Sequence, residues 1–165
     1  MKSLFIVRHA KSSWKFPHLS DAERPLNGRG KRDLPDMASR FHKTGHHIDL
    51  IISSPATRAL TTATGFAKRL RIAQENFVLE DEFYHASTRT IKNRLSQVGD
   101  QYDSVMIFGH NPGLTSLIES LSDFNLYNLP TCAVCGISFD IETWKSILNT
   151  EGTKFYYDYP KSTLE

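Results

Sequence analysis

The chain has 165 residues, of which 39% are hydrophobic, 23% charged and 11% aromatic, and its formal net charge is +2. This length indicates one domain spanning residues 1–165, and the ordinary composition argues against a disordered, collagen-like or coiled-coil protein. The small net charge, without a run of lysine or arginine, argues against a nucleic-acid partner. The N-terminal apolar run, Leu4 to Val7, is too short for a signal peptide or a membrane span. With only two cysteines, no disulfide framework is indicated, and we expect a cytoplasmic protein without a membrane partner.

Strands and helices are predicted to alternate along the chain. Short apolar segments predict strands at residues 3–7, 50–53, 77–80, 104–108, 134–141 and 154–159. Apolar residues at helical spacing predict a helix after Gly30 that ends near Gly45, and another over residues 88–98. Two further helices are expected to begin at once after a strand, one with Ser54 as N-cap and one with Asn111 as N-cap.

This order of elements indicates an α/β fold in three layers, a mainly parallel sheet with helices on both faces. Ligands of such sheets bind beyond the carboxyl ends of the strands. The connection over residues 11–27 is long and polar, as binding loops and lids often are.

Basic side chains follow three of the predicted strands. Arg8 and His9 end the first strand, Arg58 lies one turn into the helix after the second, and His110 follows the strand 104–108. Helical side chains lean toward the helix N-terminus, so Arg58 is able to reach back over its strand end. A neutral histidine beside guanidinium groups is suited to attack on a phosphate, with His9 as nucleophile and the other three holding the oxygens.

Two metal-site interpretations were weighed against this one. His9, His110 and an acidic residue would form a plausible ligand set, but two arginines beside them disfavour a divalent cation, so no metal is expected. Cys132 and Cys135 have the spacing of a redox or zinc pair, but no second ligand pair follows them. We therefore expect both cysteines to be small residues near a strand start.

The motifs resemble those of the histidine phosphatase superfamily, which includes the cofactor-dependent phosphoglycerate mutases. The resemblance covers residues 3 to about 121 and is carried by four segments in family order: Arg8-His9-Ala10, residues 24–30, residues 53–59 and residues 109–113. It implies a phosphoglycerate-mutase-like fold, a phosphorylated nucleophile at His9, and a phosphate pocket made by Arg8, Arg58 and His110.

The chain departs from the family pattern at several positions. Ala10 replaces the usual glycine, and Lys15 stands where many members have an asparagine. Family members acting on alcohol esters use a carboxylic acid after the third strand, and Glu82 aligns best with it, with Asp81 and His85 as rivals. Arg24 is a candidate for the edge of the phosphate pocket, the alternative being a salt bridge that anchors the loop.

The resemblance is strongest to the short bacterial phosphohistidine phosphatases, which implies an open site. The sequence thus predicts a metal-independent phosphatase, without a cofactor, that removes phosphate from phosphohistidine on a partner protein. Phosphatases of small phosphate esters or nucleotide-like metabolites are the alternative within enzymes, a mutase being less favoured for lack of room. A phosphate-sensing module without turnover is the alternative outside enzymes. A cluster of His42, His46 and His47 near a helix end is interpreted as structural or solvated.

Overall fold

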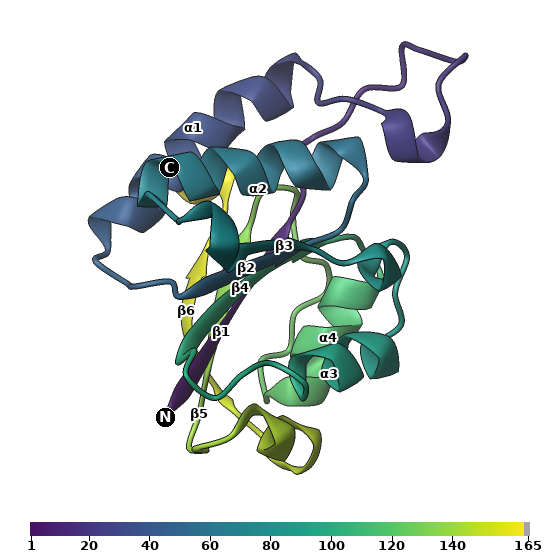
Figure 1. Cartoon of the computed structure of the whole chain (residues 1–165). Coiled ribbons are helices and arrows are strands. Elements are labelled where there is room, and N and C mark those ends of the chain that lie inside the picture. Colours follow the sequence, from purple (N-terminus) through teal and green to yellow (C-terminus); the bar gives the residue numbers. More distant parts are fainter. Residues whose placement is uncertain (164–165) are drawn as a thin grey trace.

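One twisted sheet forms the centre of the molecule (Figure 1). The computed structural model describes residues 1–163, and within them the strand order is β3-β2-β4-β1-β5-β6. The strands are β1 (Lys2–Arg8), β2 (Leu50–Ser53), β3 (Phe77–Leu79), β4 (Ser104–Gly109), β5 (Val134–Phe139) and β6 (Thr153–Asp158). The strands β3, β2, β4 and β1 are parallel, whereas β5 is antiparallel to both of its neighbours. The sheet is therefore mainly parallel, as predicted.

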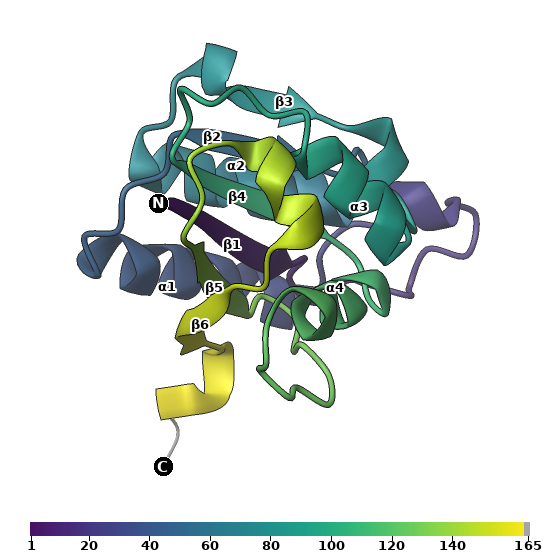
Figure 2. The same cartoon turned by 90° about the horizontal axis from the view of Figure 1, so that it is seen from below.

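Helices cover both faces of this sheet, which gives the expected three layers (Figures 1 and 2). One face carries α1 (Gly28–Lys43) and α2 (Thr57–Leu70), and the other carries α3 (Thr88–Leu95) and α4 (Gly113–Leu121). Short 3-10 turns lie at η1 (Asp21–Glu23), η2 (Gln74–Asn76), η3 (Asp81–Phe83), η4 (Trp144–Asn149) and η5 (Pro160–Thr163).

The two faces divide the core because side chains alternate along each strand. In β1, Phe5 and Val7 pack with α1 and α2, whereas Leu4 and Ile6 pack with α3 and α4. Trp144 lies in the part of the core that faces α3 and α4 and has no exposed surface. Its indole N–H donates to the Tyr102 carbonyl at 2.7 Å. Both faces of the central strands are thus buried, which explains their nearly continuous apolar sequences.

Parallel pairing brings three strand ends to one edge of the sheet. Arg8 at the end of β1 is paired with Gly109 at the end of β4, and Phe108 of β4 is paired with Ser53 at the end of β2. The segments that follow these strands are therefore neighbours at the carboxyl edge, where ligands of such sheets bind.

The predicted boundaries were wrong by a few residues at several ends. The second helix begins at Thr57 with Ala56 in the N-cap position rather than Ser54, and the fourth begins at Gly113 after Pro112 rather than Asn111. The third strand ends at Leu79 and the fifth at Phe139, short of the predicted residues 80 and 141. Both predicted capping side chains still accept a backbone N–H near the helix start: Ser54 Oγ accepts from Ala56 at 3.3 Å, and Asn111 Oδ1 accepts from Thr115 at 3.2 Å. They also have tertiary partners, because Ser54 contacts His110 and Asn111 donates to the Leu129 carbonyl.

The first helix begins earlier than predicted, at Gly28, and its start is bound to the segment after β1. The Asn27 side chain caps it by accepting the Gly30 N–H at 2.9 Å, and the Asn27 N–H donates to the Lys11 carbonyl at 2.9 Å. Gly30 lies so close to Lys11 that a Cβ at residue 30 would run into the Lys11 carbonyl oxygen. This contact fixes the course of the chain two residues beyond His9.

We expect Gly30→Ala to lower the free energy of unfolding by about 1–3 kcal/mol, because the added methyl group meets backbone that has no room to withdraw. Gly28→Ala in the same helical turn is the matched control. Its Cβ would meet only the flexible Arg32 guanidinium at 3.5 Å, so stability should change by less than about 1 kcal/mol. Urea denaturation followed by circular dichroism measures both, and equal stability of the two variants would contradict the packing argument.

Candidate active site

His9 occupies the carboxyl edge directly after β1, with 7% of its surface exposed. Its Nδ1 lies 2.7 Å from the Ala10 carbonyl oxygen. A carbonyl only accepts hydrogen bonds, so this contact puts the ring hydrogen on Nδ1 and leaves a lone pair on Nε2. The Ala10 N–H in turn donates to Thr62 Oγ1 at 2.9 Å, and the Thr62 hydroxyl donates to the Arg58 carbonyl at 2.7 Å. His9 is thereby oriented with a nucleophilic nitrogen and tied to the helix that carries Arg58.

The environment keeps the His9 ring neutral. Burial, followed by the charges of Arg58, Arg8 and Arg24, lowers the pKa of His9 to about 4, although the bond to the Ala10 carbonyl opposes the shift. Burial is the largest of these causes of the lowered His9 pKa. A neutral imidazole at physiological pH retains the lone pair that nucleophilic attack requires.

Two arginines lie at the same edge. Arg8 donates from Nη1 to the Leu129 carbonyl at 3.0 Å, and Arg58 donates from Nη1 to the Asp21 carbonyl at 2.7 Å. Burial and the charge of Arg58 lower the pKa of Arg8 from its ordinary value. The positive charges of Arg8 and Arg58 act on each other, and a bound anion would relieve this repulsion.

His110 follows β4 and packs against His9, with ring centroids 5.4 Å apart. Its Nε2 lies 2.8 Å from Ser54 Oγ, which also accepts the Ala56 N–H at 3.3 Å. The Ser54 hydroxyl is then free to donate to Nε2, an arrangement that puts the ring hydrogen on Nδ1. Burial, followed by the charges of Arg58 and His9, lowers the pKa of His110 to about 3. His110 is thus a neutral hydrogen-bond donor beside His9.

A polar hollow of about 300 Å³ opens over His9 and the two arginines, with His110 packed on the His9 ring beside it. It is lined by Arg8, His9, Lys11, Ser12, Trp14, Arg24, Arg58 and Thr131. Within residues 1–163, the buried atoms Arg8 Nε and His110 Nδ1 have no hydrogen-bond partner. Buried donors are rarely left unpaired, and oxygens of a tetrahedral anion in this hollow would satisfy such groups.

Arg24 has contacts that fit both interpretations of the sequence. It lines the hollow, and it also anchors the loop through Asp21 at 3.0 Å and the Ser13 carbonyl at 3.2 Å. Its guanidinium carbon lies 3.4 Å from the ring centroid of Trp14, whose surface is 75% exposed. Arg24 therefore fixes an exposed aromatic ring at the mouth of the hollow.

Asp21 is a site residue that sequence reasoning missed. Its carboxylate accepts from Arg58 Nη2 at 3.0 Å and from the Tyr84 hydroxyl at 2.6 Å, and it pairs with Arg24. The Tyr84 hydroxyl and the Arg58 guanidinium hold the pKa of Asp21 well below its ordinary value. Ser20 and Glu23 form a capping box around η1, and this Ser-x-x-Glu pattern was the available signal that Asp21 lies in an ordered turn.

Glu82 does not line the polar hollow over His9, nor a second hollow that is lined by His110 and His85. Glu82 is exposed in η3, and its backbone N–H donates to Glu80 at 3.3 Å. The rings of Tyr84 and His85 instead lie 5.5 Å from the His110 ring. Lys15 is also exposed. Of the three residues proposed as acid, His85 is therefore the one beside the histidines.

The described residues contain no group of three or more His, Cys, Asp or Glu side chains arranged to hold a metal ion. Cys132 and Cys135 are free and buried. Burial raises the pKa of both thiols, that of Cys135 to about 12. These thiols are protonated core residues, and such thiols are poor ligands and poor nucleophiles.

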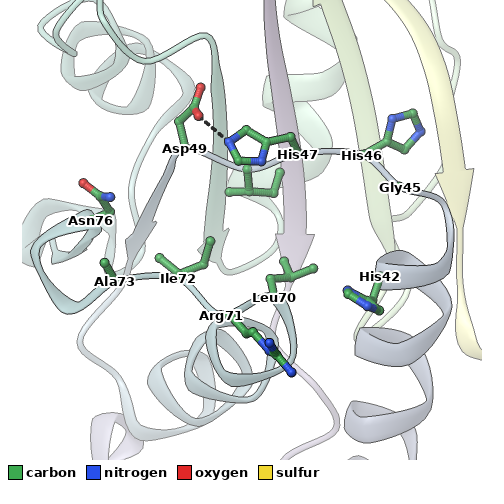
Figure 3. A pocket seen from close by; sticks show the side chains of 11 residues that line it. His42, Gly45, His46, His47, Asp49, Leu70, Arg71, Ile72, Ala73 and Asn76 are labelled. Carbon is green, nitrogen blue, oxygen red and sulfur yellow. Dashed lines mark ion pairs between the residues drawn. The ribbon is translucent and has the colours of Figure 1, made fainter.

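A separate hollow of about 390 Å³ lies at the opposite, amino edge of the sheet (Figure 3). His42, His46 and His47 line it together with Arg71, and His47 pairs with Asp49 at 2.8 Å just before β2. His46 packs its ring on Phe155 and Phe5. The cluster therefore has a packing and surface role, distant from the site at the carboxyl edge.

A neutral histidine with a free Nε2, the half-buried Arg8, the buried Arg58 and a second neutral histidine are together able to accept a phosphoryl group. Residues 4–124 match the histidine phosphatase superfamily (branch 1), and the chain belongs to this family. This places it among the phosphatases, which are hydrolases.

Relatives of known sequence cover much of the chain. An uncharacterized chloroplastic protein of Arabidopsis thaliana is 26% identical over 159 residues, which are 92% of this chain and 72% of that protein. Phosphoserine phosphatase 1 of Hydrogenobacter thermophilus is 34% identical over 86 residues, which are 48% of this chain and 39% of that enzyme.

Solved structures share the fold. The SixA protein of Agrobacterium tumefaciens superposes with a TM-score of 0.82 at 23% identity, over 96% of this chain and 98% of that one. The protein histidine phosphatase SixA complexed with tungstate gives a TM-score of 0.81 at 21% identity, over 96% and 97% of the two chains. Separately, no helix in the described part of the chain is both long and apolar enough to cross a membrane.

We expect the His9 imidazole to titrate near pH 4, not near the ordinary histidine value of about 6.5. Burial and the arginines disfavour the imidazolium, so His9 stays unprotonated as the pH falls from neutral to about 5. A pH titration of the ring signals by NMR, assigned with a His9→Gln variant, measures this directly. An inflection of the His9 signal near pH 6.5 would contradict the electrostatic description.

Proposed function

We propose that this phosphatase transfers the phosphoryl group of phosphohistidine on a partner protein to His9 and then hydrolyses phospho-His9, without a metal ion. The observation that carries the proposal is the His9 ring. Its Nδ1 is bound to the Ala10 carbonyl, which leaves Nε2 unprotonated, and the ring lines a hollow with Arg8 and Arg58 and packs on His110.

In the first step, His9 Nε2 attacks phosphorus and the bond to the leaving group breaks. Charge on the three equatorial oxygens is met by the Arg8 and Arg58 guanidinium groups and by the His110 Nδ1 hydrogen. In the second step, water attacks phospho-His9 and releases phosphate. The same donors serve both steps, because phosphorus passes through the same type of transition state twice.

Two features support a protein substrate. The connections between β2 and α2 and between β4 and α4 are short, so neither builds a wall over the site. Aromatic side chains are exposed nearby: Trp14 lines the hollow, and Tyr127, which is 100% exposed, lies two residues before Leu129, whose carbonyl binds Arg8. Exposed aromatic residues are favoured as anchors in protein interfaces. The fold shared with SixA structures, one of which is titled a protein histidine phosphatase, supports the same substrate class.

A small phosphate ester is the second candidate substrate. The segment shared with phosphoserine phosphatase 1 at 34% identity favours it, although that segment covers 48% of this chain. Phosphate release in the presence of a chelator, compared between a phosphohistidine-bearing carrier protein and 4-nitrophenyl phosphate, separates the two. We expect higher kcat/KM on the carrier. Faster turnover of the ester would reverse the assignment, and carrier binding without phosphate release would indicate a phosphate-sensing module.

We expect His9→Ala to lower kcat by at least about 10³-fold, because no other group supplies the nucleophile. Arg58→Ala and His110→Ala should each lower kcat/KM by about 10²–10³-fold through lost stabilisation of the equatorial oxygens. Arg69→Ala, on the exposed side of the same helix as Arg58, is the control and should leave kcat/KM unchanged. Rapid quenching with labelled substrate should trap acid-labile phosphate on the wild-type chain, and substantial activity in His9→Ala would overturn the covalent mechanism.

We expect Trp14→Ala to raise KM for the carrier protein by about 10-fold while changing KM for 4-nitrophenyl phosphate by less than about 3-fold. The indole would contact the partner protein beyond the phosphate, and the aryl ester is too small to use that contact. Steady-state kinetics on both substrates test this. An equal loss on both would instead assign Trp14 to the positioning of Arg24.

A further inference from the structure

A second hollow adjoins the phosphate site on the other side of His110. It measures about 360 Å³ and is lined by the segment 85–88 that precedes and opens α3, by residues 110–113, and by Ser116. Because His110 packs on the His9 ring and also lines this hollow, only the His110 ring separates the hollow from His9. The group that leaves the phosphorus has this space beside it.

His85 is the titratable side chain that this hollow adds to the site. Its ring lies 4.1 Å from the Tyr84 ring and 5.5 Å from the His110 ring, measured between centroids. Its backbone φ is 53°, in the left-handed region, which is uncommon outside glycine although asparagine, aspartate and histidine enter it more often than other residues. Such conformations cost free energy and are concentrated at functional sites.

Asp21 fixes which nitrogen of His85 is available. The Asp21 carboxylate oxygen lies 3.3 Å from His85 Nε2 and also accepts from Tyr84 and Arg58. A carboxylate at Nε2 accepts the hydrogen on that nitrogen and orients the ring, as it does in other Asp–His pairs. The proton exchanged with a substrate is then the one on Nδ1.

Resting on the proposed function, we propose that the hollow beside His110 receives the leaving group and that His85, oriented by Asp21, is its proton donor. When His9 Nε2 bonds to phosphorus and the bond to the leaving atom breaks, the His85 proton passes to the leaving group. For phosphohistidine, the acceptor is the imidazole of the partner protein, which departs as a neutral ring. When water then attacks phospho-His9, His85 takes the proton of that water and returns to its starting state.

The geometry favours His85 over the carboxylic acid that the sequence comparison indicated. Both residues are exposed, but Glu82 lines neither hollow, whereas His85 lies against His110 and lines the second one. Gly113 reinforces the placement, because a Cβ at residue 113 would run into the Ala86 carbonyl oxygen. The segment that carries His85 is thus held directly against the start of α4.

The test compares kcat/KM on phenyl phosphate and 4-nitrophenyl phosphate, since kcat/KM includes only the steps up to phosphoryl transfer. The nitro group makes the phenol a better leaving group that needs less protonation. We expect His85→Asn to lower kcat/KM by about 100-fold on phenyl phosphate and by less than about 5-fold on 4-nitrophenyl phosphate. Asparagine tolerates the left-handed backbone, so the substitution removes the acid without adding backbone strain. His42→Asn, at the exposed amino edge, is the matched control and should match wild type on both substrates.

Equal losses on the two esters would overturn the proton-donor role and leave His85 with a structural one. The leaving-group-dependent loss in Glu82→Gln, with none in His85→Asn, would assign the acid to Glu82. Failure of the proposed function has a different signature, which is turnover in His9→Ala or the absence of trapped phospho-His9. An active His9-dependent enzyme that is indifferent to His85→Asn would therefore refute this inference alone.

Discussion

Parallel pairing of β1 with β4 and of β4 with β2 is the constraint on which the site depends. The pairing aligns Arg8 with Gly109 and Ser53 with Phe108. The three segments that follow these strands therefore begin side by side at the carboxyl edge of the sheet. Residues separated by about fifty positions in sequence are thereby brought to one edge by the register of the paired strands. The chemistry then needs only short connections, because each basic side chain is already at the edge where a ligand binds.

Charge balance at this edge comes from the loop that crosses it. Arg58 is buried, and Arg24 is nearly so, and a buried charge without a partner is strongly destabilising. Asp21 accepts hydrogen bonds from both guanidinium groups, and its backbone carbonyl also binds Arg58. One acidic residue thus holds two cations in place while leaving His9 among positive charges. Burial acts on His9 in the same direction as these charges. It lowers the pKa of His9 because it removes the water that would stabilise an imidazolium.

Sequence reasoning identified the parts of the site that follow from regular structure. His9, Arg58 and His110 stand at fixed offsets from buried strands, so periodicity alone predicted their common edge. It identified neither Asp21 nor the contact between His85 and His110, because both depend on how irregular loops cross the sheet edge. The helix starts were misplaced for a related reason. Local capping preference favoured Ser54 and Asn111, and both side chains do accept a backbone N–H there, but they also bond to His110 and Leu129, and the regular helices begin two to three residues later.

The stacking of Trp14 on Arg24 gives the site an optical property of its own. The chain has two tryptophans: Trp144 is sealed in the core, and Trp14 lies with most of its surface in solvent at the mouth of the phosphate hollow. Emission from the buried indole is shielded from events at the surface, whereas emission from the exposed one depends on the guanidinium beneath it and on the water around it. An anion that binds Arg24, or a protein that covers the Trp14 ring, changes the emission of Trp14 while the emission of Trp144 stays constant. The enzyme therefore carries an intrinsic fluorophore at its own entrance, and occupancy of the site is readable without a label.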